Sequence, residues 1–308
     1  AKLPRFREED FALLSARGPI DGARIEDWPV GYDDLEPHYA AAEASFGVAG
    51  EAGANPFAAW RSGPYPMRPG DDMPTALVSA AAAQRAGLHP YRAPTGVNSV
   101  AYDDRPACVD CGYCSGYGCA IHAKGDPIAA LARALRTGRC RIVPEAYVTE
   151  LVLDPAGRRA TGVRYLDLTV CPDPPVRELR ASRAVVLAAG AFETPRLLLR
   201  QGIGGDAVGR YLTYHYQTFT VGWFPHSVGG ERGRSVTHLH DDLMIDTPDL
   251  RRVAAAAGLA WVRGGVVEHG GANAPVEEAT TYGPGAHHPA SMRDSAIRRR
   301  IWVFTMRG

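Results

Sequence analysis

Four cysteines lie within twelve residues and are the side chains whose type and spacing most directly suggest chemistry. They are Cys108, Cys111, Cys114 and Cys119. Thiolates that converge from one loop can hold an iron–sulfur cluster, and the same set, with His122 as a further ligand, would suit tetrahedral zinc. A redox-active disulfide and a loop of reduced cysteines without a special role are the alternatives. In a chain of this length, the close spacing favours local metal or redox chemistry over a disulfide framework.

A second candidate site follows the apolar run 184–188, which predicts a β-strand buried on both faces. The run ends in Ala189 and Gly190, and a helix is predicted from about residue 192 to residue 200. Small residues let a ligand approach the backbone closely. The N–H groups at a helix N-terminus suit a diphosphate or an electron-rich ring edge. An ordinary strand–turn–helix without a ligand is the alternative.

The same segment resembles the second signature of the glucose–methanol–choline (GMC) oxidoreductase family. That signature has two small residues, then Ser/Thr-Pro, two aliphatic residues and finally Ser-Gly-aliphatic-Gly. The residues in register here are Gly190, Ala191, Thr194, Pro195, Leu197, Leu198, Gly202, Ile203 and Gly204. The one departure is Gln201, which stands where the signature has serine.

Weaker similarity extends over about residues 5–307 and resembles the gluconate 2-dehydrogenase-like branch of the family. The resemblance implies a bound FAD, with its adenine near Val148. The residues that it implies for cofactor binding are Val148, Ala189, Gly190, Thr194, Pro195, Val208, Gly209 and His215. A comparable cysteine motif precedes an alanine–lysine pair in that branch, and some related dehydrogenases carry an iron–sulfur cluster in this region. The interval before Cys119 departs from the ferredoxin-type spacing.

Two parts that the resemblance implies are missing from this sequence. One is the Gly-x-Gly-x-x-Gly turn that binds the FAD diphosphate, and the other is the C-terminal histidine that takes the hydroxyl proton. The pair His287–His288 is expected in an exposed loop, so no catalytic residue is assigned. We therefore expect an interior fragment of the enzyme that alone turns over no substrate.

The elements that would position these residues follow from turn signals and apolar patterns. Helices are predicted at residues 33–46, 75–86, 127–136, 192–200 and 250–257. Strands are predicted at residues 141–144, 147–153, 161–168, 176–181, 184–188, 218–224, 259–268 and 301–306. Together with the resemblance, this order predicts a mixed α/β fold. It would contain part of a doubly wound FAD-binding domain with a β-meander, and a substrate domain with a mainly antiparallel sheet.

Three segments make up the predicted domain organisation. Residues 1–87 would form substrate-domain or cap elements, residues 88–212 part of the FAD-binding domain with the cysteine-rich loop, and residues 213–308 part of the substrate domain. The frequent glycine (34) and proline (24) fit a loop-rich enzyme.

Charge and hydropathy exclude other classes of protein. The 34 basic and 34 acidic residues balance, which argues against a nucleic-acid-binding surface. No apolar run approaches the roughly 20 residues of a membrane span, and the N-terminus has no apolar signal region, so a cytoplasmic location is expected.

The function that the resemblance implies is oxidation of a CH–OH group by hydride transfer to FAD. The substrate would be a small alcohol, sugar or sterol-like molecule, and an external acceptor would take the electrons. Two alternatives are a catalytically inactive remnant of such an enzyme and an iron–sulfur electron-transfer protein.

Overall fold

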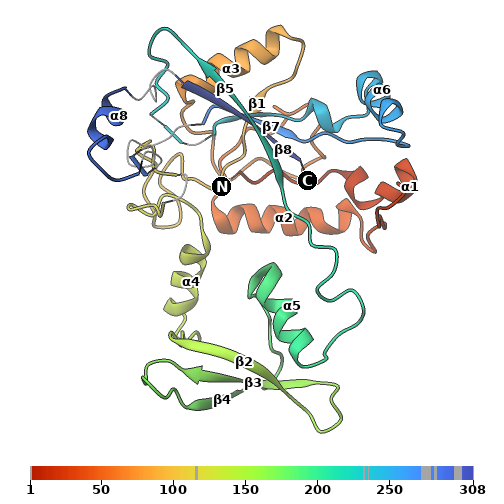
Figure 1. Ribbon diagram of the computed structural model, residues 1–308, viewed down its shortest axis with the longest axis vertical. Coiled ribbons are helices and arrows are strands. Elements are labelled where there is room, and N and C mark those ends of the chain that lie inside the picture. Colours follow the sequence, from red (N-terminus) through yellow and green to blue (C-terminus); the bar gives the residue numbers. More distant parts are fainter. Residues whose placement is uncertain are drawn as a thin grey trace. The chain divides into compact units, whose positions relative to one another are not determined.

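The computed structural model describes residues 2–114, 117–231, 233–234, 236–271, 279–280, 283–294 and 300–307. The chain divides into two compact units (Figure 1). Unit 1 comprises Ala1–Arg133 with His215–Gly308, and unit 2 comprises Ala134–Tyr214. The three predicted domain segments stay a prediction about the whole protein.

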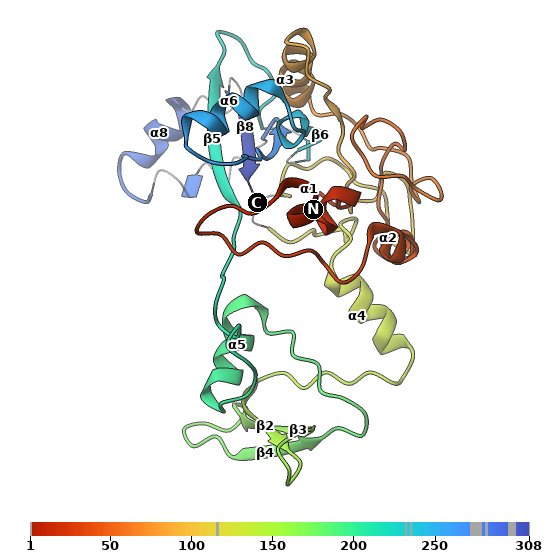
Figure 2. The ribbon, with the colours of Figure 1, turned by 90° about the vertical axis from the view of Figure 1, so that its right-hand side faces the viewer.

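The described part of unit 1 contains a five-stranded antiparallel sheet. Its order is β1 (Tyr91–Arg92), β6 (His238–His240), β7 (Val266–His269), β8 (Arg300–Arg307) and β5 (Tyr216–Trp223). Helix α3 (Pro74–Arg85) contacts β6, β7 and β8 and covers part of this sheet (Figures 1 and 2). Its N-terminal end is tied to the sheet edge, because the Met73 N–H donates to the Thr237 hydroxyl at 3.2 Å.

The longest helix of unit 1, α2 (Tyr32–Phe46), has clear local signals at both ends. Asp34 accepts a hydrogen bond from the Gly31 N–H at 2.9 Å, and acidic residues in the first turn suit the positive end of the helix dipole. Gly47, in the left-handed conformation, ends the helix. The predicted boundaries are therefore confirmed to within a residue.

Smaller elements complete unit 1. They are η1 (Glu8–Phe11), α1 (Leu13–Arg17), η2 (Asp242–Met244), α6 (Pro248–Ala256) and α8 (His288–Asp294). Helix α4 (Pro127–Arg136) crosses the boundary between the units. None of the described helices is long and apolar enough to cross a membrane.

The interior of unit 1 combines apolar clusters with buried charge. One cluster packs Tyr91, Leu239 and Val236 beneath the sheet edge, and another packs Phe11 against Tyr32. Between the N-terminal segment and α2, the carboxylate of Glu43 accepts hydrogen bonds from two arginines.

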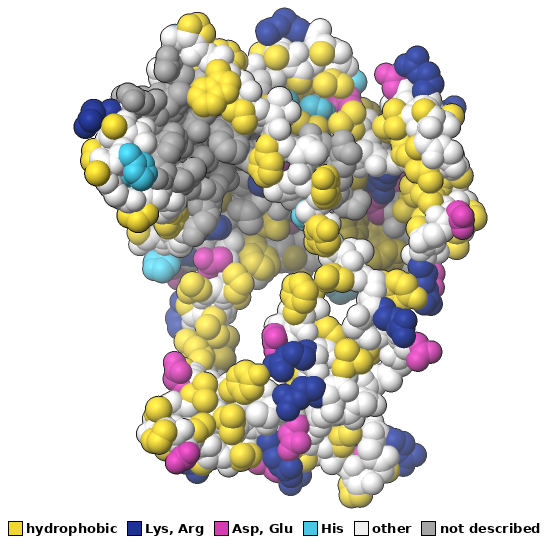
Figure 3. Space-filling view, in the orientation of Figure 1, with side chains coloured by type: hydrophobic (Ala, Val, Ile, Leu, Met, Phe, Trp, Pro, Cys, Tyr) yellow, Lys and Arg dark blue, Asp and Glu magenta, His cyan; other side chains and the backbone are white. Residues whose placement is uncertain are grey.

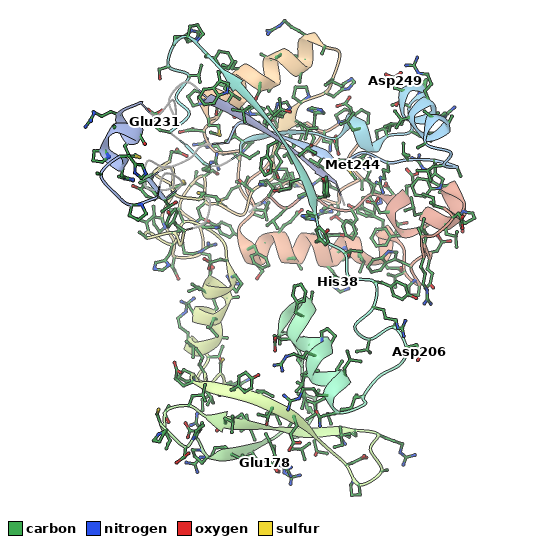
Figure 4. The ribbon with its side chains drawn as sticks, in the orientation of Figure 1. His38, Glu178, Asp206, Glu231, Met244 and Asp249 are labelled. Carbon is green, nitrogen blue, oxygen red and sulfur yellow. The ribbon has the colours of Figure 1, made fainter. Side chains whose placement is uncertain are left out.

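Unit 2 consists of a three-stranded meander and one helix. The strands β2 (Ala146–Leu153), β3 (Ala160–Asp167) and β4 (Val176–Arg180) pair in chain order, and α5 (Gly190–Arg200) follows. Figure 4 labels Glu178 on β4 and Asp206 in the loop after α5. Few side chains are buried: Leu151 on β2 and Leu197 on α5 are 7% and 8% exposed. Figure 3 shows many apolar side chains open to solvent on the meander.

Three predicted strands are wrong or too long. Residues 184–188 and 141–144 have no strand structure, and Val186 is 84% exposed. A strand needs a hydrogen-bonded neighbour along its edge, and none of the described residues pairs with residues 184–188. The predicted strand 259–268 begins only at Val266. In residues 259–265, the Gly264 N–H donates to the Leu243 carbonyl, and the Trp261 indole N–H donates to the Gly18 carbonyl. These donors therefore bond to residues outside the sheet.

Candidate cofactor site

The start of α5 is the first part of the candidate site. The helix begins at Gly190, whose φ is +84°, and the preceding Ala189 N–H donates to the Thr194 hydroxyl at 3.1 Å. The N–H groups of the first turn have no intrahelical acceptor and lie at the positive end of the helix dipole. A Cβ added at Gly190 would meet no atom within 4 Å, so the approach to this helix end is open.

Side-chain bonds hold β2 next to α5. Arg196 on α5 donates to the Tyr147 hydroxyl at 2.8 Å and is also paired with Glu193. Val148, the next residue on β2, is 38% exposed, and the strand is bulged between Val148 and Glu150. The predicted adenine-side residue and the predicted helix N-terminus therefore belong to one structural unit.

Gln201 makes a second link between the two elements, which sequence reasoning missed. Its side-chain amide accepts from the Leu151 N–H at 2.7 Å and donates to the Leu151 carbonyl at 2.9 Å. The amide thus takes the place of a backbone partner on the outer edge of β2. The available signal was that glutamine stands where the family signature has serine.

The glycines after α5 have a steric role. Gly202 and Ile203 donate to the carbonyls of Leu199 and Leu198, which is the Schellman arrangement that ends a helix. A Cβ on Gly204 would lie 2.5 Å from the Cγ2 atom of Val208.

Gly209 is equally constrained, because its φ is +76° and an added Cβ would lie 2.7 Å from the Cδ1 atom of Leu199. The predicted site residues Val208 and Gly209 therefore pack back onto the end of α5. Pro195 lies inside α5, one residue after Thr194.

His215 is not brought together with these residues inside one unit. It is exposed and precedes β5 in unit 1, whereas the other predicted cofactor-binding residues lie in unit 2. Its role near the cofactor stays a prediction.

The four cysteines lie in the cysteine loop (residues 98–124), which Asn98 organises. This fully buried side chain donates to the carbonyls of Tyr102, Arg105 and Pro106. The Asn98 carbonyl accepts from the Cys108 N–H, and the Asn98 N–H donates to the Ala123 carbonyl. Both arms of the loop are therefore held at Asn98.

Within the described residues, which include all four thiols, no group of three or more Cys, His, Asp or Glu side chains is arranged to hold a metal ion. All four cysteines are free. Burial raises the pKa of the Cys108 thiol to about 11 and also raises the pKa of Cys114, which favours the protonated thiol over the thiolate that binds metals. The arrangement gives no support to the predicted iron–sulfur cluster.

Comparison with known proteins shows which proteins this chain is similar to. Residues 74–217 match the family model of the GMC oxidoreductases. The chain is 34% identical to the gluconate 2-dehydrogenase flavoprotein of Pantoea cypripedii, over 60% of this chain and 32% of the relative. It is 32% identical to the fructose dehydrogenase large subunit of Gluconobacter japonicus, over 68% of this chain and 38% of the relative.

A solved structure supports the fold. The FAD-dependent oxidoreductase from Chaetomium thermophilum aligns with 98% of this chain and 58% of its own length, with a TM-score of 0.50 and 15% identity. The chain spans about a third of the length of the two curated relatives. The mixed α/β fold with antiparallel sheets is confirmed. The segment that contains the β2–β4 meander and α5 matches the family model of the GMC oxidoreductases.

Proposed function

We propose that the whole protein is an FAD-dependent oxidoreductase that oxidises a CH–OH group and passes the electrons to an external acceptor. The match of residues 74–217 to the GMC family carries the proposal, because this segment contains the candidate cofactor site. Two relatives are named for gluconate and fructose. A sugar or sugar acid is therefore the substrate class to test first.

The residues of unit 2 fit a cofactor of this kind. The open N-terminus of α5 offers N–H groups to a negatively charged or electron-rich part of FAD. Ala189, Gly190 and Thr194 would hold that part, and Val148 would lie against the adenine. Phe192 is 71% exposed on the first turn and offers apolar surface beside it. When bound, FAD supplies the hydride acceptor.

A titration with FAD tests the site. Replacing Gly190 with valine puts a side chain into the open approach to α5, and flavin-fluorescence quenching should then report weaker binding than for the unchanged chain. Gly157→Val is the matched control, because Gly157 also has a positive φ (+68°) and open space but lies in the β2–β3 turn. Equal FAD affinity in the two variants would argue against cofactor binding at α5.

The alternative is that this chain alone binds no flavin. The exposure of Val186 (84%) and Phe192 (71%) favours it, because these apolar side chains lack a covering partner among the described residues. Purification decides between the two: stoichiometric flavin absorbance would eliminate the alternative. Iron analysis of protein purified without oxygen tests whether the cysteine loop holds an iron–sulfur cluster.

A further inference from the structure

One edge of the five-stranded sheet in unit 1 is a long strand, β5, that pairs with a described strand on one side only. β5 is the last strand in the sheet order, and its partner is β8 (Figure 2). Seven of its eight residues are exposed, and they include residues on both faces of the sheet. The backbone N–H and C=O groups on the outer edge of such a strand are a template for a further strand.

The sequence of β5 lacks the residues that keep an edge strand from pairing. Natural edge strands carry lysine, other charges, proline or a bulge that twists the edge away. Residues 216–223 contain no charged residue and no proline, and their pairing with β8 runs from end to end without a shift in register. Three aromatic rings stand on β5, those of Tyr216, Phe219 and Trp223, which are 61%, 54% and 64% exposed. An edge of this kind favours an extended, uncharged partner strand.

A second copy of β5 is such a strand when it is related to the first by a two-fold axis perpendicular to the sheet. Cross-strand neighbours point to the same face, so opposed residues must lie an even number of positions apart. An axis through Phe219 therefore sets this ring against its own copy. On the other face of the sheet, Tyr216 then opposes Gly222. Thr218 opposes Thr220 on that same face, and pairs of all three kinds are favourable between antiparallel strands.

We propose that β5 pairs with β5 of a second copy of this chain, so that two five-stranded sheets join into one sheet of ten strands. The interface is isologous, because the same residues serve both partners. It lies in unit 1 and uses none of the residues assigned to FAD, so it goes beyond the proposed oxidoreductase function.

The size of the interface sets its strength. A fully buried aromatic side chain removes about 150–250 Å² from solvent, so the exposed parts of the three rings correspond to roughly 120 Å² each. Over two copies, the rings can therefore bury at most about 700 Å². Stable interfaces bury about 1,200–2,000 Å². The dimer should accordingly be weak, with a dissociation constant on the order of 100 µM.

Sedimentation equilibrium of the intact chain tests the proposal. The concentrations should extend from about tenfold below to about tenfold above the expected dissociation constant. We expect the apparent mass to rise with concentration from that of one chain towards that of two. A single species with the mass of one chain over the whole range would overturn the proposal, and this result depends on no variant.

Opposite charges at residue 219 test the two-fold register. In the Phe219→Lys or the Phe219→Glu variant, like charges would stand directly opposite each other, so each variant alone should dimerise at least about tenfold more weakly than the unchanged chain. An equimolar mixture should dimerise more strongly than either variant alone, because lysine then faces glutamate across the axis. No recovery in the mixture, or full dimerisation of either variant alone, would overturn the proposal.

A control and a second variant complete the experiment. Val253→Lys adds the same charge on α6, at a side chain that is 55% exposed, and should dimerise like the unchanged chain. If circular dichroism shows that the Phe219 variants do not fold, Thr220→Lys introduces a lysine on the other face of β5 and should also weaken the dimer. Dimerisation that Thr220→Lys leaves unchanged, or that Val253→Lys weakens as much as Phe219→Lys, would place the self-association away from β5.

Discussion

Replacing Glu43 with glutamine should strongly destabilise unit 1. The Glu43 side chain on α2 is 7% exposed, and its two oxygens accept four hydrogen bonds. Arg5 donates two of them, at 2.8 and 3.0 Å, and Arg61 donates the others, at 3.0 and 2.6 Å. Although burial acts against the ionised form, the hydrogen bonds from Arg61 and Arg5 hold the pKa of Glu43 below its ordinary value.

Glutamine has nearly the same shape as glutamate, so the change isolates the charge. The neutral amide keeps one acceptor oxygen, and its NH₂ group faces guanidinium donors that now lack an acceptor. Removing one partner of a buried ion pair costs about 3–5 kcal/mol when the remaining charge stays buried and unpaired. Arg5 keeps its bond to Glu36 at 2.9 Å, so the cost falls on Arg61, whose carboxylate partner among the described residues is Glu43. With a denaturant slope of about 2 kcal/mol per M, a loss of about 4 kcal/mol lowers the urea midpoint by about 2 M.

Tryptophan fluorescence gives a readout that is specific to unit 1. The five tryptophans all lie outside residues 134–214. Trp60 packs edge-on against Tyr32 at 6.1 Å between ring centroids, and Tyr32 also accepts a hydrogen bond from Arg5. Unfolding around Glu43 should therefore change the emission of Trp60.

The control is Glu26→Gln. Glu26 pairs with Arg24 at 2.8 Å, but its side chain is 68% exposed, and exposed pairs contribute about 0–1 kcal/mol. A shift of the Glu43→Gln midpoint no larger than that of Glu26→Gln would refute the reasoning, because the buried charge would then contribute no more than a solvated one.

Three further changes should have measurable effects on stability. Gln201→Ala should destabilise unit 2 by about 1–3 kcal/mol, because it removes two hydrogen bonds and leaves the Leu151 backbone groups on β2 unpaired. Hydrogen exchange at β2 amides, compared with β4 amides, measures this effect. Unchanged protection of the β2 amides would contradict the prediction. Burial and the neighbouring His240 lower the pKa of His269 to about 4. Below about pH 6.5 the unfolded chain binds a proton that the folded chain does not, so stability should fall between pH 6.5 and 4 and stay unaffected by this group above pH 6.5. His269→Gln should flatten that slope in pH-dependent urea titrations, and an unchanged slope would refute the assignment. Gly209→Ala should destabilise unit 2 by more than about 1 kcal/mol, because Gly209 has a positive φ and lies close to the Leu199 side chain. Gly157→Ala, in an open turn, should destabilise it less. Thermal melts followed by circular dichroism compare the melting temperatures of the two variants.

Local chemistry made much of the fold predictable. Helix α2 has acidic residues at its start and Gly47 at its end, and the β2–β3 turn has an Asp-Pro-Ala-Gly sequence. These signals act over a few residues, so the sequence shows them directly. The small and helix-starting residues from Ala189 to Thr194 were predictable for the same reason.

Very short strands could not be predicted in this way. β1 has two residues and β6 has three, which is less than the alternation that identifies a strand. They exist because Tyr91 and Leu239 pair across the sheet edge and join one buried cluster.

The sequence by itself determined the resemblance to the GMC family, the helix that carries the candidate cofactor site and the residues at its N-terminus, because a motif and its turn chemistry lie within one continuous stretch. Only the tertiary structure decided that Gln201 completes the edge of β2, that Arg7 meets Asp241 and that residues 184–188 form no strand among the described residues. These outcomes depend on partners that are distant in the sequence or absent from the described residues, and no local pattern encodes which donor and which acceptor will meet.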